Sequence, residues 1–139
     1  MASSAPVAAV FNTSPDTVEL LRVVLQHAGF LVVSAYTFEI RDGKVDLEQF
    51  LHLAEPSVVV YDIAPPYDAN WSLFQNLLAN SPLQRYRYVI TSTNAPYVQR
   101  LAGDVHVHEV IGKPYDLDEI VRAVQFAAHD DGERAGEVM

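Results

Sequence analysis

Three side chains that can bind or carry a charged group follow apolar segments of the chain. Asp62 ends the run SVVVYD, Thr93 lies in VITSTN, and Lys113 lies in IGKPYDLDEI. A carboxylate at the end of a buried strand is costly to desolvate unless a cation or a hydrogen-bond donor lies nearby. A hydroxyl can donate to an anion, and a lysine supplies a flexible point charge. If the three segments are strands of one sheet, they form an anion pocket beside an acceptor oxygen.

Each residue also has an ordinary structural explanation. Asp62 can cap a helix or form a turn, as Asp often does next to Pro-rich loops. Thr93 can be a β-branched strand residue whose hydroxyl satisfies a neighbouring backbone group, and Lys113 can be a solvated surface lysine. The functional interpretation therefore depends on all three lying at successive strand ends of a single sheet.

The apolar pattern predicts such a sheet. Short β-branched runs alternate with segments of helical period, which is typical of βαβ units around a parallel sheet. The predicted strands are 6–11, 30–36, 57–62, 87–93 and 108–113, and the predicted helices are 15–28, 45–55, 70–79, 95–103 and 116–129. We expect an α/β fold with a flavodoxin-like, doubly wound sheet of five parallel strands. In such sheets, ligands bind outside the carboxyl ends of the strands.

Two helices carry clear boundary and core signals. The first helix has Ser14 as its expected N-cap, Pro15 as its first residue and Gly29 as its stop. Asp116 is the expected cap of the last helix. The expected core-facing residues are Val18, Leu21, Leu25 and Ala28 in the first helix, and Ile120, Val121, Val124 and Phe126 in the last.

Length and composition limit the class of protein. The 139 residues are half hydrophobic, enough for a single domain over residues 1–129, with a flexible tail expected over 130–139. There is no cysteine, which excludes disulfides and thiolate chemistry. A formal net charge of −9 disfavours binding to nucleic acid, because that binding depends on Lys and Arg. No apolar run is long enough to span a membrane, so a cytoplasmic protein is expected.

Three segments resemble the receiver domains of two-component response regulators. They are DIAPPYD after an apolar strand, VITSTN, and IGKPYDLDEIVRAV, and the resemblance extends from Val7 to about Ala128. It implies the (βα)5 receiver fold and a phosphoryl group transferred to Asp62 from a histidine kinase or phosphotransfer protein. It also implies that Thr93 binds a phosphoryl oxygen and that Lys113, before a cis Pro114, pairs with the phosphoryl charge.

The resemblance implies a signalling protein and not an enzyme. No output domain fits in 139 residues beside the receiver, so we expect a stand-alone regulator that acts through protein contact. The expected partner surface is the fourth helix, the fifth strand and the fifth helix, and a homodimer is also compatible with the sequence.

The sequence departs from the family at its metal site. Receivers hold Mg²⁺ with an acidic pair after the first strand, where this chain has Asn12 and Thr13. Mg²⁺ prefers carboxylate oxygens, so the expected site is weak and consists of Asp62, Asn12 and the Ala64 backbone carbonyl. Two further departures are Val110 in place of a switch aromatic and a long link over residues 37–50 that we expect to form extra surface.

These departures leave alternatives open. One is a pseudo-receiver that binds proteins without being phosphorylated. A flavin or nucleotide binder is disfavoured because no Gly-rich phosphate loop follows the first strand. A metal site of Asp104, His106 and His108 is a weak further alternative. Trp71, after PPYDAN, either shields the site or is a core residue.

Overall fold

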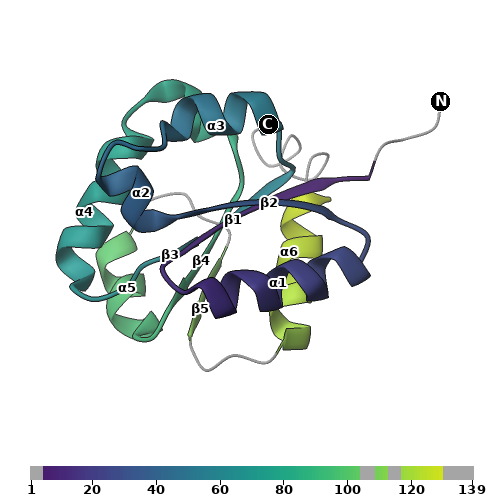
Figure 1. The fold of residues 1–139 in the computed structure, drawn as a ribbon. Coiled ribbons are helices and arrows are strands. Elements are labelled where there is room, and N and C mark those ends of the chain that lie inside the picture. Colours follow the sequence, from purple (N-terminus) through teal and green to yellow (C-terminus); the bar gives the residue numbers. More distant parts are fainter. Residues whose placement is uncertain (1–4, 104–108, 113–116, 130–139) are drawn as a thin grey trace, which may run out of the picture.

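The computed structural model describes residues 5–103, 109–112 and 117–129 (Figure 1). One sheet of five parallel strands runs through the molecule in the order β2-β1-β3-β4-β5. The strands are β1 (Val7–Asn12), β2 (Leu31–Tyr36), β3 (Val58–Asp62), β4 (Tyr88–Ser92) and β5 (Glu109–Gly112). This confirms the predicted α/β class and the five-stranded sheet. The strand order reverses between β1 and β3, and a crevice for ligands forms at such a reversal.

Helices cover both faces of the sheet (Figure 1). One face carries α1 (Pro15–His27) and α6 (Leu117–Ala128). The other carries α2 (Thr37–Arg41), α3 (Leu47–Ala54), α4 (Tyr67–Leu78) and α5 (Ala95–Ala102), and a 3₁₀ helix, η1 (Ser81–Arg85), precedes β4. Each parallel crossover passes through at least one helix, as this sheet type requires.

Successive residues of the central strands point into two different cores. In β1, Ala8 and Val10 contact the helices of one face, while Ala9 and Phe11 contact those of the other. This explains why the strands are apolar without alternation, since neither face meets water. The larger core is aromatic: the Tyr61 ring lies 4.7 Å from Phe74, measured between centroids.

The predicted boundaries of α1 are confirmed. The Ser14 hydroxyl accepts a hydrogen bond from the Thr17 amide at 3.2 Å, and Pro15 opens the helix. Gly29 follows the helix at φ 100°, a backbone conformation that residues with a Cβ rarely adopt. Val18, Leu21 and Leu25 are buried as expected.

The structure corrects the predicted core face of the last helix. Phe126 is 60% exposed, and the buried positions of α6 are Ile120, Ala123, Val124, Ala127 and Ala128. A helix completes one turn every 3.6 residues, so Ile120, Val124 and Ala127 lie on one side of α6 and Phe126 does not. Small alanines on this side let α6 lie close to the sheet.

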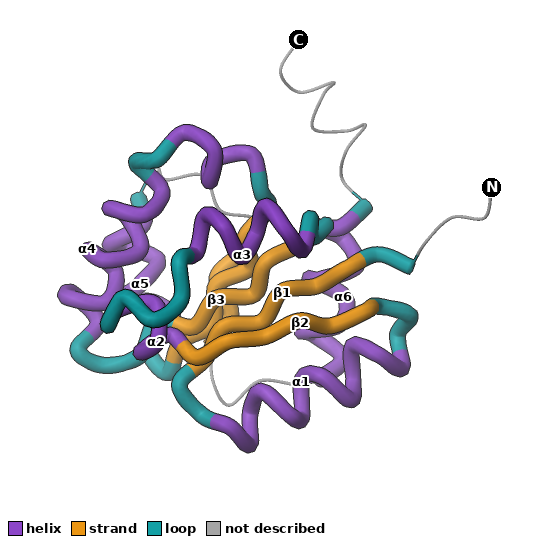
Figure 2. Tube along the Cα trace, turned by 45° about the horizontal axis from the view of Figure 1, so that its top comes forward, coloured by secondary structure: helices purple, strands orange, loops and turns teal. Residues whose placement is uncertain are grey.

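Two further boundaries differ from the prediction. Helix α4 begins at Tyr67, three residues before the predicted Asn70, because Pro66 takes the N-cap position. The long link over residues 37–50 contains the short helix α2, which extends beyond the carboxyl end of β2 (Figure 2). The Asp116 cap, the Lys113–Pro114 bond and the tail over 130–139 lie outside the described residues.

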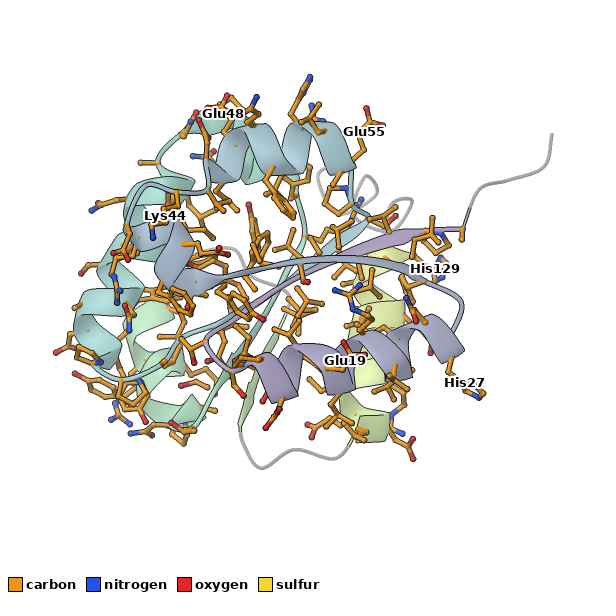
Figure 3. All side chains as sticks on the ribbon, viewed as in Figure 1. Glu19, His27, Lys44, Glu48, Glu55 and His129 are labelled. Atoms are coloured by element: carbon orange, nitrogen blue, oxygen red, sulfur yellow. The ribbon has the colours of Figure 1, made fainter. Side chains whose placement is uncertain are left out.

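Charged side chains of the described residues lie mainly on the outside of the helices. Figure 3 shows Glu48 and Glu55 pointing away from the sheet above α3, and His27 pointing away from the end of α1. Glu19 of α1 is also exposed. No helix in the described part of the chain is both long enough and apolar enough to cross a membrane.

The buried Tyr61 hydroxyl predicts a loss of stability at high pH. Burial, with a smaller contribution from the Asp62 charge, raises the pKa of Tyr61 from 10 to about 12. The contribution of Tyr61 to stability is therefore complete below pH 10 and is lost as the pH rises through 12. Between these two values Tyr61 ionises in the unfolded chain but stays neutral in the folded protein. Two pKa units correspond to about 3 kcal/mol.

We expect the Tyr61→Phe variant to lose less stability than the wild type between pH 10 and pH 12. Urea unfolding at several pH values would measure this difference. The Tyr61 charge also raises the pKa of buried Tyr88, so the change at position 61 lowers the contribution of both tyrosines to this loss. Parallel stability curves would contradict the assignment.

Candidate functional site

Buried polar side chains gather at one edge of the sheet. The buried polar residues in the described part of the chain are Asn12, Asp62, Thr91 and Ser92, and they lie at the carboxyl ends of β1, β3 and β4. Asp62 is the one charged residue of the set and is 4% exposed. Because buried polar groups cost free energy unless they are satisfied, their collection at the strand reversal marks a candidate site.

The Asp62 carboxylate is held by Thr91. Strands β3 and β4 pair in a register that places Asp62 opposite Thr91, and in a parallel pair these side chains lie on the same face. The Thr91 hydroxyl donates a hydrogen bond of 2.6 Å to Asp62 Oδ1. A hydrogen bond of this kind stabilises the ionised carboxylate and fixes its orientation.

The sequence alone did not identify Thr91. In the structure β4 ends at Ser92, so Thr93 lies beyond the strand, is exposed and hydrogen-bonds to the Tyr67 hydroxyl of α4. The hydroxyl that contacts Asp62 is therefore that of Thr91, and the binding of a phosphoryl oxygen by Thr93 stays a prediction. The signal that could have found it is the strand register, which places residue 91 opposite residue 62.

The Ser92 hydroxyl has a structural role. It donates to the backbone carbonyl of Ile63 at 2.9 Å and accepts from the Asn94 amide at 3.2 Å. These bonds tie the end of β4 to the loop that follows Asp62. They hold the backbone of the site in place from both strands.

A cavity of about 220 Å³ opens beside Asp62. Its polar lining comprises Thr13, Thr37, Arg41 and Asn70, and its apolar lining includes Phe38, Ala64, Pro65 and Leu73. Asp62 and Arg41 are the charged residues among the described residues that line it. A cavity of this size admits a small anion or the phosphoryl group of a partner side chain.

The three oxygens expected to bind Mg²⁺ do not fit that ion well. Asn12 Oδ1 accepts from the Ser14 amide at 3.1 Å, and the Ala64 carbonyl accepts from Asn70 Nδ2 at 2.7 Å. Asp62 Oδ1 accepts from Thr91, so each residue already uses an oxygen in an internal hydrogen bond. Asp62 is the only carboxylate of the three, and no group of three acidic or histidine side chains suited to a metal occurs in the part of the chain that the structure describes.

The remaining predicted site residues divide into two groups. Lys113 and the proposed cluster of Asp104, His106 and His108 lie outside the described residues, so their roles stay predictions. Trp71 is 2% exposed and packs against Phe74 in the larger core. This favours the core interpretation of Trp71 over the shielding one.

Comparisons with known proteins find the fold but no closer relative. No family model matches the sequence, and no curated protein matches it. Among solved structures, the chemotaxis protein CheY4 of Vibrio cholerae shares 19% identity with a TM-score of 0.67, covering 90% of this chain and 99% of that one. A signal receiver domain of a two-component histidine kinase from Clostridium thermocellum shares 15% identity with a TM-score of 0.72, covering 89% and 98%.

A third structure extends the similarity. The C-terminus of Escherichia coli RcsC, which contains a linker region and a phosphoreceiver domain, shares 18% identity with a TM-score of 0.76 and covers 97% of this chain and 50% of that one. The chain has the receiver-domain fold. This matches the fold that the resemblance in the sequence implied.

The Thr91–Asp62 bond predicts a stability difference between two threonine variants. Thr91→Val keeps the β-branched shape but removes the hydroxyl that donates to the buried carboxylate, and hydrogen bonds to charged groups contribute about 1.5–3 kcal/mol. We expect a loss of that order in the free energy of unfolding, measured in urea at pH 7. The matched control is Thr93→Val, which removes an exposed hydroxyl and should cost less than 1 kcal/mol, by the same reasoning. Equal losses in both variants would contradict the assigned role of Thr91.

Proposed function

We propose that this chain is an atypical response-regulator receiver that accepts a phosphoryl group on Asp62. The observation that carries the proposal is the place of Asp62: a buried carboxylate at the carboxyl end of the central strand β3, oriented by Thr91 and open to a cavity. The similar solved structures support it, since they include a chemotaxis protein, a signal receiver domain and a phosphoreceiver domain.

Phosphoryl transfer to Asp62 needs a nucleophile, a phosphoryl donor and groups that neutralise the charge of the phosphoryl group. A carboxylate oxygen of Asp62 forms a bond to phosphorus while the bond between phosphorus and the imidazole nitrogen of a phosphohistidine breaks. The imidazole leaves with the electron pair and takes up a proton. Catalysis of such a transfer comes mainly from positioning and from neutralising the phosphoryl charge. Thr91 positions the acceptor, and Lys113 is proposed to face the phosphoryl group.

The phosphoryl donor would be a histidine kinase or a phosphotransfer protein, and the output would be contact with another protein. We propose that this contact uses α5, β5 and α6. In this account the chain is a cytoplasmic signalling protein, binds no nucleic acid and does not act as an enzyme. Any Mg²⁺ would bind weakly, because Asn12 and Thr13 replace acidic residues.

A pseudo-receiver is the second candidate. The observation that favours it is the engagement of Asn12, Ala64 and Asp62 in internal hydrogen bonds, which leaves a poor site for the ion on which receivers depend. In that case partner binding would be the same in the wild type and in Asp62→Asn.

Phosphoryl transfer would be tested with a small-molecule donor. The protein is incubated with phosphoramidate or acetyl phosphate, and its intact mass is measured by mass spectrometry. We expect the mass of one phosphoryl group on the wild type and on Asp68→Asn, whose acidic residue is exposed, but none on Asp62→Asn. An unmodified wild type, or equal modification of Asp62→Asn, would favour the pseudo-receiver.

A further inference from the structure

We infer that Arg41 binds the phosphoryl oxygens carried by Asp62. Arg41 thereby supplies positive charge at a site that lacks a good set of ligands for a metal ion. The inference rests on the proposed function, and it assigns to the same site a charge partner in addition to Lys113. Arg41 lines the cavity beside Asp62 and belongs to α2, the helix formed by the long link over residues 37–50.

The position of Arg41 is fixed by the packing of α2. Ile40, its neighbour, is 7% exposed and lies in the larger core. The Tyr36 amide donates to Glu39 Oε1 at 3.0 Å, and the Tyr36 and Phe38 rings stack at 5.2 Å. These contacts anchor both ends of a single helical turn. The backbone of residue 41 is therefore held at the cavity, although its side chain is exposed.

The composition of the cavity favours an anion over a cation. Among the described lining residues, Arg41 is the one cation and Asp62 the one anion, and Thr13 and Thr37 add hydroxyl groups. A phosphoryl group on Asp62 adds negative charge to the cavity. A guanidinium matches phosphoryl oxygens well, because its planar fork donates two parallel hydrogen bonds.

Arg41 can make these bonds without breaking a buried interaction. Its present partner is Asp42, which accepts from Nε at 3.0 Å and from one terminal nitrogen at 3.5 Å. Both side chains of this pair are about half exposed, and exposed ion pairs contribute little to stability. The other terminal nitrogen, Nη1, makes no hydrogen bond with the described residues. Asp42 also raises the pKa of Arg41, so the guanidinium stays charged.

The inference predicts phosphorylation that does not need Mg²⁺. Labelling rates with phosphoramidate are measured by intact mass in EDTA and again in excess Mg²⁺, for the wild type, Arg41→Gln, Arg41→Lys and the control Arg122→Gln on the exposed surface of α6. We expect the wild type and Arg122→Gln to react in EDTA. Arg41→Gln should react at least about tenfold more slowly than the wild type, because loss of a hydrogen-bond donor that stabilises developing charge has an effect of this size or larger. Arg41→Lys should react at an intermediate rate.

A second measurement separates the inference from the proposed function. Binding of beryllofluoride, an unreactive mimic of a phosphoryl group, is followed by ¹⁹F NMR in EDTA for the same four proteins. We expect binding by the wild type and Arg122→Gln and at least tenfold weaker binding by Arg41→Gln, for the same reason. Urea unfolding should show that all variants fold, because the changed side chains are exposed.

Each outcome has one meaning. Equal labelling of Arg41→Gln and the wild type, or labelling of the wild type only with Mg²⁺, would overturn the role of Arg41 and leave phosphorylation of Asp62 intact. If no protein is labelled, the proposed function fails, and the binding of beryllofluoride alone tests the role of Arg41. Binding that depends on Arg41 would then support it, and absent binding or binding unaffected by Arg41→Gln would overturn it.

Discussion

The cost of burying a carboxylate at the edge of the sheet is the constraint on which the rest of the site depends. Asp62 is almost completely removed from water, at the point where the strand order reverses. An ionised group in such a place is tolerated only when donors or cations face it. The register between β3 and β4 meets this need by placing the Thr91 hydroxyl 2.6 Å from the carboxylate. The geometry of the sheet thus determines which residue can support the acceptor.

The fold could be predicted from the sequence because its signals are local. The strands were predicted from mainly apolar runs of six or seven residues, and Ser14, Pro15 and Gly29 marked the ends of α1. Phe126 was misplaced because a bulky apolar residue was preferred to the alanines that actually face the sheet. In a helix, the period decides which residues are buried, and size alone is a poor guide.

The site was less predictable because it depends on pairing between distant segments. Asp62 was found from its place at the end of an apolar strand, and Asn12 from its place at the end of another. Thr91 could not be identified as the hydroxyl that contacts Asp62 without knowing where β4 ends and how it aligns with β3. Arg41 was missed because a link of unusual length gives no local sign that it folds into a helix beside the cavity.

The charge around Asp62 connects these observations. Strand β1 ends at Asn12 and contains no acidic residue that could help Asp62 attract a divalent cation. Among the described residues that line the cavity beside Asp62, the other charged residue is Arg41. Such a site suits an acceptor that becomes more negative during its reaction. In the arrangement proposed above, the neutral residues Asn12 and Thr13 and the short helix α2 act together at Asp62.

The most direct test is to locate the phosphoryl group chemically. Hydride from borohydride reduces an aspartyl phosphate to homoserine, and peptide mass spectrometry then identifies the modified position. After treatment with phosphoramidate and borohydride, the account predicts homoserine at position 62 and at no other aspartate. Homoserine at Asp16 or Asp68, or none anywhere in the chain, would contradict it.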